Sequence, residues 1–309
     1  MISMLDALSM LRRFRGYLAG AGGVGDMMNA LKWSVWYALK WWADVKSSGR
    51  TDTPLARALY RSLLHHGYID EKGEVVKKIE RPERPKGAYA QEWLNLHESF
   101  DELLPKLLSG AGGDLAKMLL YAMQAQGWYK LWRDDFLKAA GFRGKRVFEP
   151  RMRGGHNAAD IYAEYTPELY AGYEESDEAV ELLLQVVPNV NVGSCPGSGV
   201  CVFPAASACG LEEVLEGLKI EEVLLFNVLH WMEDPLKELL CIKRAAPGAL
   251  FYVGQPVVET MPGFLAINTA SGAYHVFSRE DVEGLLQAAG LKRRRLLLRE
   301  IPFYASVWA

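Results

Sequence analysis

One stretch of the sequence decides the fold: EEVLLFNVLHWMEDP, residues 221–235. Residues 222–226 form a largely apolar run, which is typical of a strand in a parallel sheet that is covered on both faces. A helix is expected directly afterwards, over residues 234–245. A buried strand followed closely by a helix is the repeating unit of an α/β domain.

The same alternation extends from residue 141 to the end of the chain. Further strands are expected over 145–149, 169–173, 249–254, 296–300 and 303–308. Further helices are expected over 157–165, 177–187 and 279–289, the last capped by Ser278 and ended by Gly290. Because residues 191–209 are interrupted by several glycines and prolines, we expect an irregular loop there. We therefore predict a doubly wound, Rossmann-like α/β domain over residues 111–309.

The first part of the chain is mainly helical in its pattern. Helices are expected over 5–19, 26–46, 54–66, 89–108 and 114–140, with Asp26 as cap of the second and a possible interruption at Gly127. Thr53 or Asp52 can cap the third helix, and Pro54 suits its first turn. Residues 68–76 indicate a short β-hairpin with Gly73 in its turn.

Helices followed by a short hairpin are typical of winged-helix modules. We predict a helical, winged-helix-like dimerisation domain over residues 1–110, and a DNA reader is the alternative interpretation. The 309-residue chain has a net charge of −3. This balance disfavours a general nucleic-acid binder, since phosphate contacts need a basic surface. The basic run at 292–295 is interpreted as the exposed beginning of a strand.

The sequence favours a cytoplasmic protein without a membrane segment. Charged residues interrupt the N-terminus where a signal peptide would need an apolar core. The Trp-rich stretch 27–43 is too short for a membrane span and contains Lys32 and Lys40. We interpret it as a buried or interface helix.

Four cysteines occur, at positions 195, 201, 209 and 241. Their spacing matches no common zinc pattern, so we predict no metal site. The favoured interpretation is that they are small buried hydrophobic residues. A disulfide within 195–209 is the alternative, which would be more plausible in a hyperthermophile.

Four segments together resemble class I S-adenosylmethionine-dependent methyltransferases. They are RVFEP (146–150) with Gly154 and Gly155, AGYEESDEAV (171–180), LLFNVLHWMEDP (224–235) and RAAPGAL (244–250). They occur in the family's order and spacing, and the resemblance covers about residues 140–309.

The resemblance implies a binding site for S-adenosylmethionine at the carboxyl ends of the strands. Glu149 would anchor the methionine part, and Gly154 and Gly155 would let the backbone approach it closely. Glu174 would accept hydrogen bonds from both ribose hydroxyls, since a carboxylate offers two acceptor oxygens. Asn227 would line the floor near the methyl group.

His230 occupies a further position that the resemblance marks. In O-methyltransferases that pair a winged-helix dimer module with this fold, a histidine just after the fourth strand acts as general base. A pKa near neutrality suits removal of a proton from a substrate hydroxyl. The resemblance thus implies O-methylation of a small molecule by a homodimer, with His230 as the catalytic base.

The cofactor loop departs from the family pattern at two positions. In the register set by Glu149, the family's three glycines fall on Arg151, Arg153 and Gly155. Arginine adopts the left-handed backbone only at a cost of about 1 kcal/mol or more. Two interpretations stay open: a methyltransferase with a remodelled loop, or a catalytically inactive binding or structural dimer whose arginines could accept an anion. A regulator that uses the hairpin around 71–78 is a third.

Overall fold

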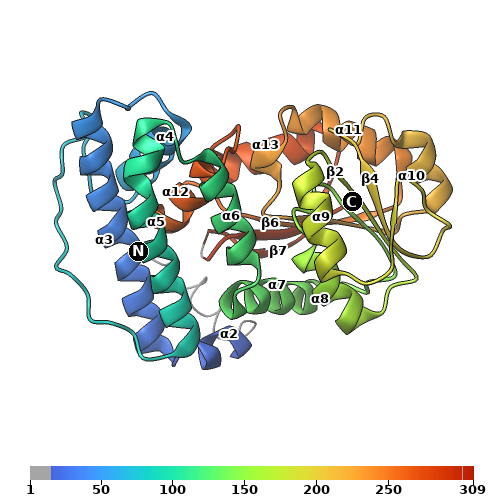
Figure 1. Ribbon diagram of the computed structural model, residues 1–309, viewed down its shortest axis with the longest axis horizontal. Coiled ribbons are helices and arrows are strands. Elements are labelled where there is room, and N and C mark those ends of the chain that lie inside the picture. The colour runs from blue at the N-terminus through green and yellow to red at the C-terminus, as the bar shows by residue number, and fades with distance from the viewer. Residues whose placement is uncertain (1–14, 301) are drawn as a thin grey trace. The chain divides into compact units, whose positions relative to one another are not determined.

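The computed structural model describes residues 15–300 and 302–309 (Figure 1). Most of the helix expected over 5–19 lies outside the described residues. The chain forms two compact units, each of which contains more than one stretch of chain. The first contains Met1–Phe136, Pro256–Glu280 and Leu298–Tyr304, and the second contains Leu137–Gln255, Asp281–Leu297 and Ala305–Ala309. The dimerisation domain over 1–110 stays a prediction.

The first unit is built from helices, most of which the sequence predicts. They are α2 Arg15–Gly20, α3 Val24–Ser48, α4 Pro54–His65, α5 Ala88–Ser109, α6 Gly113–Gln124 and α12 Pro262–Ala270. α7, Gly127–Ala140, continues from this unit into the second, and the break before Gly127 confirms the expected interruption. The start of α4 is also confirmed, because Thr53 Oγ1 accepts a hydrogen bond from the amide of Ala56. No helix among the described residues is long and apolar enough to cross a membrane.

The expected cap of α3 is wrong. The helix begins two residues before Asp26 and has Gly23 at its cap position. The Asp26 carboxylate instead accepts hydrogen bonds from the amides of Lys86 and Gly87, at 2.8 and 2.7 Å. A contact 60 residues away in sequence has therefore replaced the local one.

The hairpin expected over 68–76 is reduced to a single antiparallel bridge between Ile69 and Val75. Its turn is held by the Asp70 carboxylate, which accepts the amides of Lys72 and Glu74. Gly73 has a φ of 75°, as the sequence suggested for the turn. The winged-helix relation of this unit stays a prediction.

A fully buried histidine lies in the core of the first unit. His97 donates from Nδ1 to the carbonyl of Trp93 (2.8 Å) and accepts at Nε2 from the hydroxyl of Ser34 (3.1 Å). Its ring stacks on Trp41. A Cβ on Gly263 would lie 2.8 Å from His97 Nε2, so α12 approaches this histidine closely. Burial lowers the pKa of His97 to about 4.

We expect His97 to make the protein less stable in acid. Its pKa is about 4 in the folded protein and about 6.5 in an unfolded chain. Its contribution is therefore complete above pH 6.5 and is lost as the pH falls toward 4. The free energy of unfolding should fall by roughly 2 kcal/mol between pH 7 and pH 4.5 through this residue. Urea unfolding at both pH values measures the effect.

The matched variant is His97→Phe, which keeps an aromatic ring but cannot be protonated. It should be less stable at pH 7, since two hydrogen bonds are lost, but its stability should change less with pH. An equal pH dependence in both proteins would refute the assignment to His97.

The second unit contains the sheet, with strand order β3-β4-β2-β1-β5-β6-β8-β7. The strands are β1 Arg146–Glu149, β2 Leu169–Glu174, β3 Val190–Val192, β4 Gly199–Pro204, β5 Glu222–Phe226, β6 Leu250–Gln255, β7 Arg293–Leu298 and β8 Tyr304–Trp308. The helices are α8 His156–Tyr165, α9 Asp177–Val186, α10 Glu212–Leu218, α11 Pro235–Ala245, α13 Arg279–Ala288 and the short η1 Leu229–Trp231. From β3 to β6 in this order, each strand is parallel to the next. α8 and α11 lie on opposite faces of the sheet (Figure 1).

This arrangement confirms the predicted Rossmann-like α/β fold. β5, which contains the apolar run 222–226, is buried along its whole length between β1 and β6. The basic run before residue 296 is exposed at the start of β7, as expected.

The irregular loop expected over 191–209 is wrong, because β4 lies within this segment and β3 overlaps its beginning. β4 pairs with β2 along six residues, and β3 pairs with the outer side of β4. Glycine and proline flank the apolar core of β4, Val200–Phe203, and hid it from the sequence analysis.

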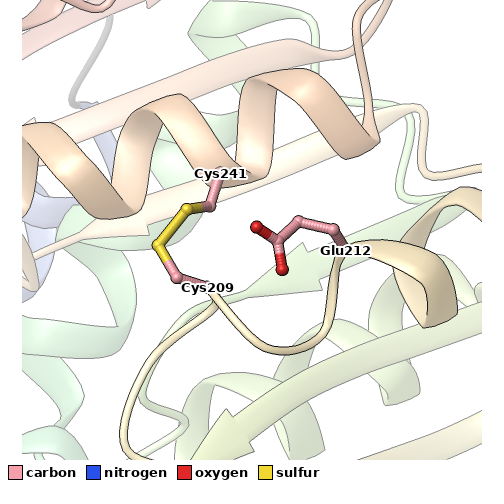
Figure 2. A group of neighbouring side chains, drawn as sticks. All are labelled: Cys209, Glu212 and Cys241. Carbon is pink, nitrogen blue, oxygen red and sulfur yellow. A yellow bond between two sulfur atoms is a disulfide. The ribbon is translucent and has the colours of Figure 1, made fainter.

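The cysteine interpretation is also wrong, since all four are paired. Cys195 bonds Cys201, which is the alternative weighed for the 195–209 stretch. Cys209 bonds Cys241 on α11, with Cα atoms 5.2 Å apart (Figure 2). The second pair joins residues that are distant in sequence and adjacent only because the loop after β4 lies against α11.

Candidate cofactor site at the strand ends

Three of the predicted site residues come together at the carboxyl edge of the sheet. Glu149 ends β1, Glu174 ends β2, and Asn227 follows β5. β1 lies between β2 and β5, and the three strands are parallel. Their carboxyl ends therefore lie at the same edge, where doubly wound sheets bind ligands.

The loop after β1 has the backbone of a glycine-rich loop even where it carries arginine. Arg151 and Arg153 have φ values of 52° and 45°, and Gly154 and Gly155 follow at 76° and 80°. Each arginine in this region costs about 1 kcal/mol or more relative to a relaxed backbone. A Cβ on Gly155 would lie 2.8 Å from Leu183 Cγ, so this glycine permits close packing. The loop backbone thus has the positive φ values of a glycine-rich loop at the positions counted from Glu149.

Glu149 is directed into the protein. Its side chain is 1% exposed. Oε1 accepts a hydrogen bond from Asn157 Nδ2 (2.8 Å), and Oε2 accepts one from the Tyr170 hydroxyl (2.7 Å). These contacts join the end of β1 to α8 and β2. The implied role in anchoring a ligand stays a prediction.

Glu174 is held by the loop that follows β1. Its Oε2 accepts the amide of Arg153 at 2.7 Å, and its Oε1 accepts the amide of Glu175 at 3.0 Å. Burial raises the pKa of this carboxyl, and the two amide hydrogen bonds act in the opposite direction. The residue lies where the resemblance implies, but both of its oxygens already accept bonds from the chain.

The side chain of Arg153 lies across the end of β5. Its Nη1 donates to the carbonyl of Asn227 (2.6 Å), and its Nη2 donates to the carbonyl of Phe226 (2.9 Å). Only 4% of the residue is exposed. A buried cation therefore covers the floor on which the resemblance places the methyl group.

Arg151 is directed to the other side of the loop, where it pairs with Glu175 at 2.6 Å. Next to it, the Tyr173 hydroxyl hydrogen-bonds Glu238 of α11. Burial raises the pKa of Glu238. The sequence marked the two arginines as departures from the pattern, but nothing in it indicated their different directions.

His230 lies in η1 and is buried, with Gln255 at the end of β6 as its partner. Gln255 Oε1 accepts the amide of Leu229 (3.1 Å), so its Nε2 faces His230 Nδ1 and donates to it. The neutral imidazole must then carry its proton on Nε2. In this arrangement His230 offers a hydrogen bond from Nε2 rather than a lone pair. Sequence reasoning missed Gln255, whose only signal was a polar residue at the end of an apolar strand.

A possible group of metal ligands, Cys209, Glu212 and Cys241, lies elsewhere on this unit. Figure 2 shows the Glu212 carboxylate directed toward the disulfide that joins the two cysteines. Arg244 contacts both Glu212 Oε1 and Cys241 Sγ at 3.2 Å. With its sulfurs bonded to each other and a cation beside it, this group is not a metal centre in the oxidised chain.

Comparison with known proteins identifies the fold. No protein-family model matches the chain, and no curated protein matches its sequence. Among solved structures, the trans-methyltransferase CalH in complex with SAH has a TM-score of 0.56 and 14% identity, covering 91% of this chain and 89% of that one. An O-methyltransferase family 2 protein from Planctomyces limnophilus DSM 3776, in complex with apigenin, has a TM-score of 0.52 and 11% identity, covering 100% and 96%. The chain has the class I methyltransferase fold.

The methyltransferase fold allows the site to be tested against its usual cofactor. The positive φ values of the loop and the position of Glu174 fit an adenosyl group at this edge. The side chain of Arg153 does not, because its guanidinium covers the carbonyls of Phe226 and Asn227. The edge can accept the cofactor only after this side chain has moved away.

Proposed function

We propose that the protein is an S-adenosylmethionine-dependent methyltransferase that acts on an oxygen of a small molecule. The observation that supports this most is the loop 151–155, which keeps the glycine backbone at four positions although two of them carry arginine. Such strain persists only where the surrounding structure holds it. The whole-chain likeness to an O-methyltransferase family 2 protein and to a trans-methyltransferase supports the same proposal.

In this proposal the chain's own residues hold the cofactor at the edge of the sheet. Gly154 and Gly155 allow close approach of the backbone, Glu174 exchanges its amide donors for ribose hydroxyls, and Glu149 supports the loop through α8. The cofactor supplies the electrophilic methyl group when it is bound. Asn227 lies on the floor of this cofactor site, which becomes accessible when the Arg153 side chain moves away.

His230 is proposed to contact the substrate oxygen. Its present Nε2–H tautomer would donate a hydrogen bond to that oxygen. To act as general base it needs the other tautomer, which requires the Gln255 amide to turn and to leave the amide of Leu229 without its acceptor. Because the ring carries its proton on Nε2, the site favours a substrate that arrives already deprotonated, as a phenolate or carboxylate.

We further propose a small molecule with acidic hydroxyls as substrate, a homodimer as the assembly and the cytoplasm as the location. The relative that was solved with apigenin supports the substrate class. The two disulfides are compatible with a cytoplasmic location in a hyperthermophile, whose intracellular proteins often contain disulfides. In other organisms the reducing cytoplasm would keep these cysteines as thiols. A nucleic-acid partner is not proposed, since the chain is acidic overall.

The proposal predicts transfer of labelled methyl from S-adenosylmethionine to apigenin or to a simpler phenol, measured with the purified protein. His230→Ala should lower kcat by about a hundredfold or more if the ring stabilises or deprotonates the oxygen. Gln255→Glu is the matched variant, since a carboxylate can accept both the Leu229 amide and a proton on Nδ1. It should raise kcat at neutral pH if His230 acts as base, and lower it if His230 acts as donor.

Absence of transfer from the unchanged protein and from Arg153→Gly alike, with no adenosyl ligand bound by either, would contradict the proposal. The observation that Arg153 already satisfies the carbonyls of the floor would then support the second candidate, a binding or structural protein that has kept the fold without the cofactor.

A further inference from the structure

The helical unit contains a hollow of its own, far along the chain from the residues of the candidate cofactor site. Its volume is about 330 Å³. This lies at the lower end of the range for small-molecule pockets, about 300–1,000 Å³. It is lined by the end of α3, by α4 and by the turn after it: Trp42, Lys46, Thr51, Ala56, Arg57, Tyr60, Arg61, Glu71 and Lys72.

The lining of this hollow is strongly cationic, although the chain as a whole is acidic. Four of its side chains are basic and one is acidic. Lys46 pairs with Glu74 at 2.6 Å, and Arg61 donates to the carbonyl of Val276. Within the described part of the chain, the side chains of Arg57 and Lys72 have neither a hydrogen bond nor an ion pair. Two exposed cations are therefore available to a ligand.

Two aromatic rings form the apolar part of the lining. Trp42 is buried, and its ring centroid lies 5.8 Å from that of Tyr60. Polar atoms of both rings are already bonded to the turn, because Trp42 Nε1 donates to the carbonyl of Gly73 (2.9 Å) and the Tyr60 hydroxyl to that of Glu71 (2.8 Å). The ring atoms that remain toward the hollow are apolar. The same bonds fix the turn to α3 and α4, so the hollow is formed before a ligand arrives.

We propose that this hollow binds a small aromatic carboxylate. The ring of the ligand packs on Trp42 and Tyr60, while its carboxylate pairs with Arg57 and Lys72. An arginine favours a carboxylate because its two parallel N–H groups match the two oxygens. A ring beside two cations is also favoured, since cations are attracted to aromatic faces.

A nucleic-acid backbone fits the same hollow less well. It needs a row of cations along an exposed surface, whereas this lining is concave, and Glu71 lies at its rim with Glu74 beside Lys46. The single pair of available cations suits one charged group. None of the lining residues belongs to the carboxyl edge of the sheet, so binding in this hollow is independent of the proposed methyl transfer.

Calorimetry and saturation-transfer NMR with cinnamate test the proposal, in the absence of S-adenosylmethionine so that no methyl group can be transferred to the carboxylate. The unchanged protein should bind it with a sub-millimolar Kd. Arg57→Ala/Lys72→Ala should bind it at least about tenfold more weakly, because the carboxylate loses its charged partners. Lys32→Ala/Lys117→Ala removes the same charge from exposed positions outside the hollow and should bind like the unchanged protein. Cinnamyl alcohol and cyclohexanepropionate, which lack the charge and the aromatic ring, should both bind more weakly than cinnamate.

Absence of cinnamate binding at millimolar concentration would overturn the proposal, as would equal affinity in the Arg57/Lys72 variant. Salt-dependent binding of a 20-base-pair duplex that displaces cinnamate and is lost in the same variant would also overturn it, in favour of a nucleic-acid surface. Thermal unfolding of each variant shows that it is folded. Both substituted side chains are exposed and make no hydrogen bond or ion pair with the residues that the structure describes, so we expect no loss of stability beyond a few tenths of a kcal/mol.

Discussion

Arg153→Gly is expected to bind S-adenosylhomocysteine about 1,000-fold more tightly than the unchanged protein. For the ligand to enter, Arg153 must give up its hydrogen bonds to the carbonyls of Phe226 and Asn227. A hydrogen bond with a charged partner contributes a net of about 1.5–3 kcal/mol. Two of them correspond to about 4 kcal/mol, or three orders of magnitude in Kd. Glycine also suits the φ of 45° at this position.

S-adenosylhomocysteine is the probe of choice because its sulfur is neutral, so the experiment measures the loss of the covering side chain alone. The affinity for S-adenosylmethionine should increase even more on this substitution, since its sulfonium no longer lies near a buried guanidinium. Isothermal titration calorimetry of both proteins gives the two Kd values.

Arg151→Gly is the matched control. Arg151 has a similar φ of 52° and is also buried, but its guanidinium pairs with Glu175 and does not cover the floor. It should change the affinity by less than about tenfold, since the pair it loses lies partly in solvent. Arg153→Ala separates the side chain from the backbone, because it removes the guanidinium and keeps the strain. If Arg151→Gly and Arg153→Gly raise the affinity for S-adenosylhomocysteine equally, the cause is loop flexibility and not the covering side chain.

Removing the disulfide between Cys209 and Cys241 is expected to lower the free energy of unfolding by about 3.5 kcal/mol. The two residues are 32 apart in sequence, and a cross-link over such a loop restricts the unfolded chain by about that amount in the chain-entropy model. Cys209→Ala/Cys241→Ala should therefore unfold at a lower urea concentration than the unchanged protein, when both are measured without reductant.

The pair Cys195 and Cys201 is the control, since it is only 6 apart. The corresponding double alanine variant should lose about 2 kcal/mol, because the closed loop is shorter. A dithiol reductant added to the unchanged protein should produce the sum of the two losses and should have no effect on a variant that lacks all four cysteines. Titration of four free thiols in the unfolded, non-reduced protein would contradict both assignments.

The order of elements was predictable because local signals and long-range packing agree. The largely apolar run of β5, the cap at Thr53 and the glycine break before α7 each have a cause within a few residues. The carboxyl-edge position of Glu174 and Asn227 also follows, since it needs only the end of each strand and the parallel order of the sheet.

The features that were predicted wrongly share a different cause, since each depends on a contact between segments that are distant in sequence. β4 is a strand because β2 and β3 pair with it, in spite of the glycine and proline at its ends. Cys209 meets Cys241 only after α11 is in place. Asp26 turns to the amides of residues 86 and 87 instead of capping α3. The positions of the two loop arginines were visible in the sequence, but only the structure shows which one covers the floor.

A crystal structure of Arg153→Gly grown with S-adenosylhomocysteine decides whether Arg153 covers an adenosyl site at the carboxyl edge of the sheet, as we propose. We expect the ribose hydroxyls on the Glu174 carboxylate and the rest of the ligand over the carbonyls of Phe226 and Asn227. Absence of the ligand from this edge at saturating concentration, with the loop 151–155 unchanged, would refute the proposal.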